Sequence, residues 1–256
     1  MIDSFIAAAE AAADVAAAVV RPFFRAPLGI VSKSDSSPVT IADRTAELAM
    51  RGVLSQRFPD HSVAGEEFGE HNPGARYRWV LDPIDGTRAF ITGRPQFGTL
   101  VALLDGDMPI LGLIDQPITR ERWIGAAGRP TRFVGEFGRA GCRPCATLGA
   151  AELSCTSPQI FAVDAPRWQK LSGLVARTSF GGDCYAYGLV ALGQVDIIAE
   201  ATMQLWDWAA LVPIVEGAGG SMTDWDGNRL RPGGGGRVLA LGDPELLPAA
   251  IAALAA

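Results

Sequence analysis

The chain has 256 residues, 48% of them hydrophobic, and a formal net charge of −6. This length supports one large domain, or two smaller ones that share an interface, around a sizeable core. The acidic balance argues against nucleic acid as a partner, because a nucleic-acid footprint is normally a basic patch. Phosphorylated substrates stay open, because bound cations can reverse the local charge.

Helical patterning opens the chain. Residues 3–21 are Ala-rich, but Glu10 and Asp14 interrupt the apolar run. We therefore expect a buried amphipathic helix, since a membrane span needs about 20 apolar residues with few charges. A loop or short strand pair is expected over 27–38, and a second helix over 40–57. No membrane association or secretory signal is expected, so the predicted location is the cytoplasm.

Strand patterning dominates the next segment, and strands alternate with helices after it. A soft boundary at 140–160 divides an N-terminal α+β half (1–140) from a C-terminal α/β half (141–256) within a single compact unit. These elements predict a layered α/β or α+β body. The expected strands are 61–65, 77–81, 97–104, 109–114, 120–127, 128–138 and 195–199, with weak candidates at 160–163 and 174–176, and the later expected helices are 184–192, 207–216 and 245–256.

The four cysteines show no paired framework. Cys142-Arg-Pro-Cys145 has C-x-x-C spacing, but no second ligand pair follows at a spacing suited to zinc. Free thiols are therefore expected.

The most informative stretch is Leu81-Asp-Pro-Ile-Asp-Gly-Thr87. Asp82 and Asp85 follow an apolar strand, so both carboxylates are expected near its C-terminal end, beside the backbone N–H groups of a Gly-Thr corner. Hard divalent cations prefer clustered oxygen ligands, and phosphate binds N–H donors at a helix start. This short segment therefore predicts a metal half-site and a phosphate half-site.

Other carboxylates stand in similarly unusual places. Glu66 follows a predicted strand and a glycine, and Asp207 lies between two tryptophans at a predicted helix start. Ionised carboxylates in apolar surroundings are costly unless they are paired or bind a metal. Most other acidic residues, such as Asp105, are expected to be solvated surface groups. Asp43 and Glu200 complete the set of candidates.

Together these motifs resemble the inositol monophosphatase superfamily, whose members are magnesium-dependent, lithium-sensitive phosphatases of sugar and alcohol phosphates. The resemblance covers nearly the whole chain and implies a layered αβαβα sandwich that forms a homodimer. The matching motifs are Lys33…Asp43, Gly65-Glu66-Glu67, the Asp82–Thr87 segment, Trp206-Asp207 and Glu216-Gly-Ala-Gly-Gly220.

The resemblance also implies the metal ligands. Glu66, Asp82 and the carbonyl of Ile84 match the ligands of a first Mg²⁺, and Asp82, Asp85 and Asp207 match those of a second. A third, looser ion near Glu66 is usual in the family. The sequence does not distinguish Mg²⁺ from Mn²⁺.

The remaining catalytic roles follow from the same resemblance. Thr87 and Asp43 match the pair that orients the attacking water, and Glu66 is expected to accept its proton. Gly86 and Thr87 match the backbone that holds phosphate at a helix start. A water bound to a metal loses its proton more readily than bulk water, so no histidine or cysteine nucleophile is required.

The substrate-selecting positions are similar to those of the bacterial and plant histidinol-phosphatases within this superfamily. The similarity lies in Asp85-Gly-Thr-Arg88-Ala-Phe, Gly93-Arg-Pro and Gly181-Gly-Asp183-Cys-Tyr-Ala-Tyr187. Asp183 and Glu200 can pair with the ammonium and imidazole of histidinol phosphate, although Glu200 suits neutral inositol equally. Arg88 either helps to hold phosphate or shapes the rim, or it is an exposed arginine paired with a carboxylate.

Three functions therefore compete. The leading prediction is hydrolysis of histidinol phosphate to histidinol and phosphate, a step of histidine biosynthesis. The second is a broad-specificity enzyme like an inositol-1-monophosphatase. The third, which the complete set of metal and water-orienting residues disfavours, is a non-catalytic interaction protein on the same fold.

Overall fold

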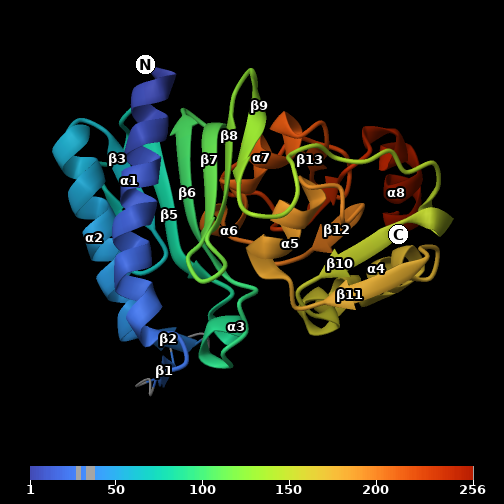
Figure 1. Ribbon diagram of the computed structural model, residues 1–256. Coiled ribbons are helices and arrows are strands. Elements are labelled where there is room, and N and C mark those ends of the chain that lie inside the picture. Colours follow the sequence, from blue (N-terminus) through green and yellow to red (C-terminus); the bar gives the residue numbers. More distant parts are fainter. Residues whose placement is uncertain (27–29, 33–37, 256) are drawn as a thin grey trace.

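The computed structural model describes residues 1–26, 30–32 and 38–255. Five layers follow one another across the molecule: two helices, a large sheet, a middle layer of helices, a smaller sheet and two outer helices (Figure 1). The expected layered α/β sandwich is thus confirmed. Lys33 lies outside the described residues. A two-stranded sheet, β1 (Ile30–Ser32) and β2 (Pro38–Thr40), leads into the second helix.

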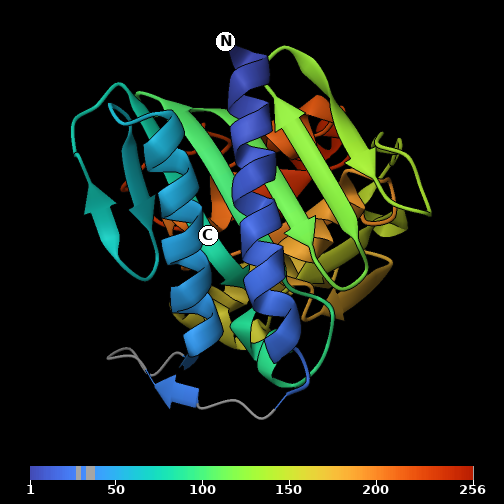
Figure 2. The same ribbon diagram turned by 60° about the vertical axis from the view of Figure 1, so that its left-hand side comes forward.

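The first layer consists of α1 (Ile2–Val20) and α2 (Ile41–Arg57), which lie side by side over one face of the large sheet (Figure 2). The buried face of α1 is largely alanine, so the helix can approach the sheet closely. No helix among the residues that the structure covers is long and apolar enough to cross a membrane.

The large sheet has seven strands, and β5, the third in spatial order, carries the acidic motif. Strand β3 runs parallel to β5, whereas β5 to β9 form an antiparallel meander. In spatial order the strands are β4 (Gly69–His71), β3 (Ser62–Gly65), β5 (Tyr77–Asp85), β6 (Gly98–Asp105), β7 (Met108–Gln116), β8 (Glu121–Ala126) and β9 (Arg129–Val134).

The smaller sheet has five strands and mixes parallel and antiparallel pairs. It lies behind a middle layer of α5 (Asp183–Val190), α6 (Leu205–Trp208) and α7 (Leu211–Gly217), and α4 (Ala165–Ser172) and α8 (Leu247–Leu254) cover its outer face. In spatial order its strands are β11 (Arg177–Phe180), β10 (Glu152–Cys155), β12 (Ile197–Glu200), β14 (Val238–Leu241) and β13 (Ser221–Thr223).

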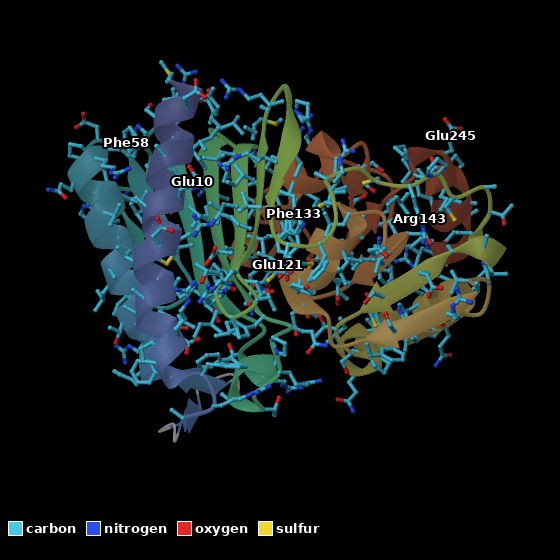
Figure 3. The ribbon with its side chains drawn as sticks, viewed as in Figure 1. Glu10, Phe58, Glu121, Phe133, Arg143 and Glu245 are labelled. Carbon is cyan, nitrogen blue, oxygen red and sulfur yellow. The ribbon has the colours of Figure 1, made fainter. Side chains whose placement is uncertain are left out.

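Three hydrophobic clusters fill the spaces between the layers, and strand alternation decides which residue enters which. Trp79 and Leu81 of β5 pack against α1 and α2, whereas Val80 packs toward the middle layer. Asp82, two residues after Val80, is next on that second face. Figure 3 shows Phe133 and Glu121 where the large sheet meets the middle layer, and the Tyr185 hydroxyl donates to Glu121 Oε2 there at 2.8 Å.

The second half differs from the expected elements in several places. Residues 158–164 form a 3-10 helix rather than a strand, and the strand expected at 174–176 occupies 177–180. Strands β10, β13 and β14 were not expected. The single helix expected over 207–216 is instead two, α6 and α7. All four cysteines are free thiols, as expected.

Candidate active site

The acidic motif occupies an irregular end of β5. The pairing of β5 with β6 shifts between Asp82 and Asp85, so Asp85 leaves the regular strand alternation that Asp82 still follows. The backbone N–H of Ile84 donates to Asp82 Oδ1 at 3.0 Å. The Thr99 hydroxyl donates to the Pro83 carbonyl at 2.8 Å and fixes the irregular segment to β6.

Asp207 reaches the same place from the C-terminal half. It is the third residue of α6, and the backbone N–H of Gln204 donates to its Oδ2 at 2.7 Å in a capping box. Carboxylate oxygens of Asp82, Asp85 and Asp207 lie within 4.8 Å of one another. The sequence therefore correctly anticipated that residues more than 120 positions apart meet here.

The electrostatics of this cluster favour a bound cation. Burial raises the pKa of Asp82 well above its usual range, and the charges of Glu66, Asp85, Asp207 and Asp43 raise it further. The pKa of Asp85 is raised mainly by burial, although a 2.6 Å hydrogen bond from the Cys184 N–H opposes the shift. Three carboxylates this close offer only hard oxygen donors, so the donor set fits a divalent cation such as Mg²⁺.

Glu66 and Asp43 stand beside this cluster. Glu66 lies in the turn after β3, outside the group of three, and its N–H donates to the Leu81 carbonyl at 3.3 Å. Asp43 is on α2 and is 2% exposed. Both contribute to the raised pKa of Asp82, so the charges of both are felt at the acidic cluster. Their roles as ligand and water-orienting group stay predictions.

The corner after the acidic motif is built by a glycine. Gly86 has a φ of +88° and precedes α3 (Thr87–Ile91). A Cβ on Gly86 would lie 3.1 Å from Asp183 and from the Gln96 carbonyl, so both conformation and space favour glycine here. The Thr87 hydroxyl donates to the Ile84 carbonyl at 3.2 Å, which brings two predicted functional groups together.

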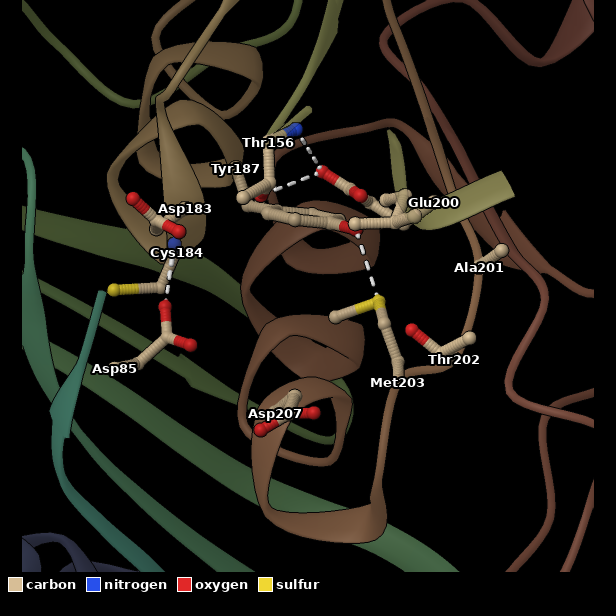
Figure 4. A pocket seen from close by; sticks show the side chains of 11 residues that line it. Asp85, Thr156, Asp183, Cys184, Tyr187, Glu200, Ala201, Thr202, Met203 and Asp207 are labelled. Carbon is tan, nitrogen blue, oxygen red and sulfur yellow. Dashed lines mark hydrogen bonds between the residues drawn. The ribbon is translucent and has the colours of Figure 1, made fainter. Parts of the chain in front are cut away.

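A cavity of about 180 Å³ opens beside Asp85 and Asp207 (Figure 4). Glu200 ends β12 on its wall and accepts hydrogen bonds from the Thr156 N–H at 2.6 Å and hydroxyl at 2.9 Å. Burial raises the pKa of Glu200 to about 8. The Tyr187 hydroxyl also faces this cavity and contacts the Met203 sulfur at 3.4 Å.

Asp183 lies between this cavity and a second hollow of about 420 Å³ that Glu66 and Thr87 line. Burial raises its pKa to about 6, against the opposing effects of Arg94, Thr156 and Arg88. Its φ of +42° is unusual for a residue other than glycine. The structure therefore brings both predicted substrate-selecting carboxylates to the cavity beside the metal-type cluster.

Arg88 and Arg94 are both exposed and both line the second hollow. Sequence reasoning singled out Arg88 but not Arg94 or Thr156. Arg94 belongs to the Gly93-Arg-Pro motif, so the sequence could have indicated it. Thr156 belongs to no recognisable motif.

Comparison with known proteins places this site in a class of metal-dependent phosphomonoesterases. The inositol monophosphatase family model matches residues 1–256, and the chain belongs to that family. It is 49% identical over 231 residues to the bifunctional phosphatase IMPL2, chloroplastic, of Arabidopsis thaliana, over 89% of this chain but only 66% of the plant protein, so it spans slightly less than two thirds of that relative.

Two further relatives have similar lengths. The histidinol-phosphatase of Chlorobaculum parvum is 38% identical over 85% of this chain and 84% of its own. A solved structure described as an inositol monophosphatase from Zymomonas mobilis has 49% identity and a TM-score of 0.91, covering 98% of each chain. These two relatives thus carry different substrate names.

Proposed function

We propose that this protein is a Mg²⁺-dependent phosphatase that hydrolyses histidinol phosphate to histidinol and phosphate. The observation that carries the proposal is the pair Asp183 and Glu200, two carboxylates beyond the metal-type cluster that line the cavity beside it. Histidinol carries an ammonium and an imidazole. A cationic group beside these two residues favours their ionised form, and carboxylates form strong charge-assisted hydrogen bonds with such groups. The plant and bacterial relatives named above add support.

Asp82, Asp85 and Asp207, with Glu66 and the Ile84 carbonyl, are the groups that would hold Mg²⁺. When bound, the ion supplies Lewis acid chemistry: it polarises the phosphoryl group and favours ionisation of water. The N–H groups at the start of α3, near Gly86 and Thr87, would bind phosphoryl oxygens.

The protein groups then complete the reaction. Glu66, with Thr87 and Asp43 behind it, orients a water molecule and accepts its proton as the oxygen attacks phosphorus. The bond from phosphorus to the ester oxygen breaks, and this oxygen takes up a proton from solvent, so the alcohol leaves neutral and Glu66 returns its proton to solvent. Asp183 and Glu200 hold the alcohol during this step. Arg88 and Arg94 at the rim attract the anionic substrate.

The second candidate is a broad inositol monophosphatase-like enzyme. It is favoured by the Zymomonas mobilis structure and by Glu200, which can accept a hydrogen bond from a neutral hydroxyl as well as from a cation. Phosphate release should be measured with histidinol phosphate, inositol 1-phosphate, fructose 1,6-bisphosphate and adenosine 3′,5′-bisphosphate. We expect the highest kcat/KM with histidinol phosphate, and a higher value with inositol 1-phosphate would overturn this assignment.

Homodimer formation is a separate proposal, tested by light scattering in solution.

A further inference from the structure

One face of α2 carries three charged residues at four-residue spacing: Asp43, Glu47 and Arg51. Residues four apart on a helix lie one above the other, so all three point in a similar direction. Asp43 and Glu47 are 2% and 0% exposed. Asp43 belongs to the candidate active site, whereas Glu47 and Arg51 have no role in the reaction proposed above.

Glu47 and Arg51 form a largely buried ion pair. This pair binds the β3–β4 hairpin, which lies beside α2 (Figure 2). Arg51 Nε donates to Glu47 Oε1 at 2.7 Å, and the backbone N–H of Glu67 donates to Glu47 Oε2 at 2.8 Å. Arg51 also donates to the Val63 carbonyl at 3.0 Å and to the Gly69 carbonyl. One ion pair thus fixes β3, the turn and β4.

Gly65 completes this arrangement. A Cβ at this position would collide with the Glu47 carboxylate, so this carboxylate can lie against the hairpin backbone only because residue 65 is glycine. Glu66 therefore stands between two neighbours that Glu47 fixes: Gly65 by close packing and Glu67 by a hydrogen bond. The direction in which the Glu66 side chain leaves the backbone follows from both.

We propose that Glu47, supported by Arg51, is a positioning residue that orients Glu66 toward the metal site. This inference rests on the proposed function, in which Glu66 is a Mg²⁺ ligand. A buried carboxylate is costly unless it is paired and hydrogen-bonded, and Glu47 is used here to order a turn of only three residues. Groups that orient metal ligands commonly change metal affinity about 10- to 100-fold when they are removed.

The test is Glu47→Gln, which preserves the size of the side chain but removes its charge. We expect the Mg²⁺ dissociation constant, measured by titration calorimetry without substrate, to rise about tenfold. Amide exchange in the peptide that contains Glu67 should also become faster. Because no substrate is present, the result is independent of whether histidinol phosphate is the natural substrate.

The chain offers a matched control in Asp196, which is 0% exposed. Its carboxylate accepts two hydrogen bonds from Arg143, at 2.7 and 2.6 Å, and one from the Glu152 N–H at 2.8 Å. It precedes β12, at the end opposite Glu200, and Figure 3 labels Arg143 in the C-terminal half. Asp196→Asn should lower the melting temperature but leave Mg²⁺ affinity unchanged.

If both variants lose stability and neither changes the Mg²⁺ dissociation constant, Glu47 serves folding alone and the proposal is overturned. Should Glu47→Gln not fold, Arg51→Lys replaces it, because lysine keeps the charge but cannot bridge both hairpin carbonyls. A several-fold weaker Mg²⁺ affinity in Arg51→Lys supports the proposal, and an unchanged affinity rejects it.

Discussion

The candidate site shows how one residue type can serve two purposes according to its surroundings. Asp82, Asp85 and Asp207 lie close enough to repel one another, so each gains from a shared cation. Asp183 and Glu200 are separated by Thr156, which donates to Glu200 through its N–H and its hydroxyl. The first set is suited to binding a metal, and the second to binding polar or cationic groups of a ligand.

Replacing Asp85 by asparagine separates an enzyme from a non-catalytic protein on the same fold. Loss of one carboxylate removes a ligand, so we expect kcat to fall at least about a hundredfold. Without metal, the same change relieves repulsion inside the cluster, and the melting temperature in EDTA should be unchanged or higher. Phosphate release and thermal melting measure both effects. Unchanged turnover in Asp85→Asn would contradict the metal-dependent mechanism.

Asp183→Asn tests recognition of the alcohol. If Asp183 pairs with a cationic group, losing its charge should raise KM for histidinol phosphate about tenfold, which is the usual size of a charge-assisted hydrogen bond. KM for inositol 1-phosphate should change little, because a neutral hydroxyl can bond to an amide as well. Steady-state kinetics with both substrates provide the comparison, and equal losses on both would assign Asp183 a role unrelated to charge.

At the scale of elements, the sequence predicted those parts whose pattern is local. The strand before Asp82 and the two N-terminal helices follow from apolar periodicity and are confirmed to within a few residues. Strands β10, β13 and β14 are three or four residues long, too short for a reliable period, and they form because neighbouring strands pair with them. The break between α6 and α7 did have a signal, because Pro213 lacks the N–H that a continuous helix would donate to the Ala209 carbonyl.

The distinction between local and long-range patterns also explains which site residues could be predicted from the sequence. Asp82, Asp85 and Gly86 stand in one short motif, so their proximity is a local property. Thr156 reaches Glu200 across 44 positions through the parallel pairing of β10 with β12. A single sequence does not reveal that pairing, since it depends on the order of strands in the sheet.

Packing of α7 on the large sheet provides a prediction at this scale. A Cβ on Gly112 of β7 would collide with the Ala210 carbonyl, and a backbone atom cannot move aside as a flexible side chain can. Gly112→Ala should therefore lower the free energy of unfolding by roughly 1–3 kcal/mol. Urea denaturation measures the change.

Gly52 is the matched control, because it lies within α2 and a Cβ there would contact nothing within 4 Å. Gly52→Ala should raise the free energy of unfolding by roughly 0.5–1 kcal/mol, since alanine favours helix. A loss of stability in Gly52→Ala as large as in Gly112→Ala would show that close packing against α7 is not the cause.

For the whole molecule, the site joins two halves that are distant in sequence. The Cys184 N–H donates to Asp85 across 99 positions. Asp207, on α6 of the middle layer, lies close to Asp82 of the large sheet. A cation bound there would tie the two halves together, and a ligand that binds only the folded state stabilises it. Magnesium should therefore raise the melting temperature, and EDTA should abolish this increase.

The pH dependence of stability follows from the same carboxylates. The pKa of Glu200 is raised to about 8 and that of Asp183 to about 6. At a pH between the pKa of each group in the unfolded chain and its raised pKa in the folded protein, the folded state binds more protons than the unfolded state. Without metal, the free energy of unfolding should therefore fall as pH rises from about 5 to 8. Glu200→Gln removes one titrating group, and its curve in EDTA should be flatter than that of the wild type.

Magnesium should reverse this trend, because cations compete with protons for carboxylates. The increase in melting temperature that Mg²⁺ produces should therefore be small near pH 5 and larger near pH 8, where the ionised form of the site prevails. Melting curves across this range, with Mg²⁺ and with EDTA, measure the difference directly. An Mg²⁺ effect of equal size at every pH would mean that the ion binds away from the buried carboxylates, because only their titration links the two.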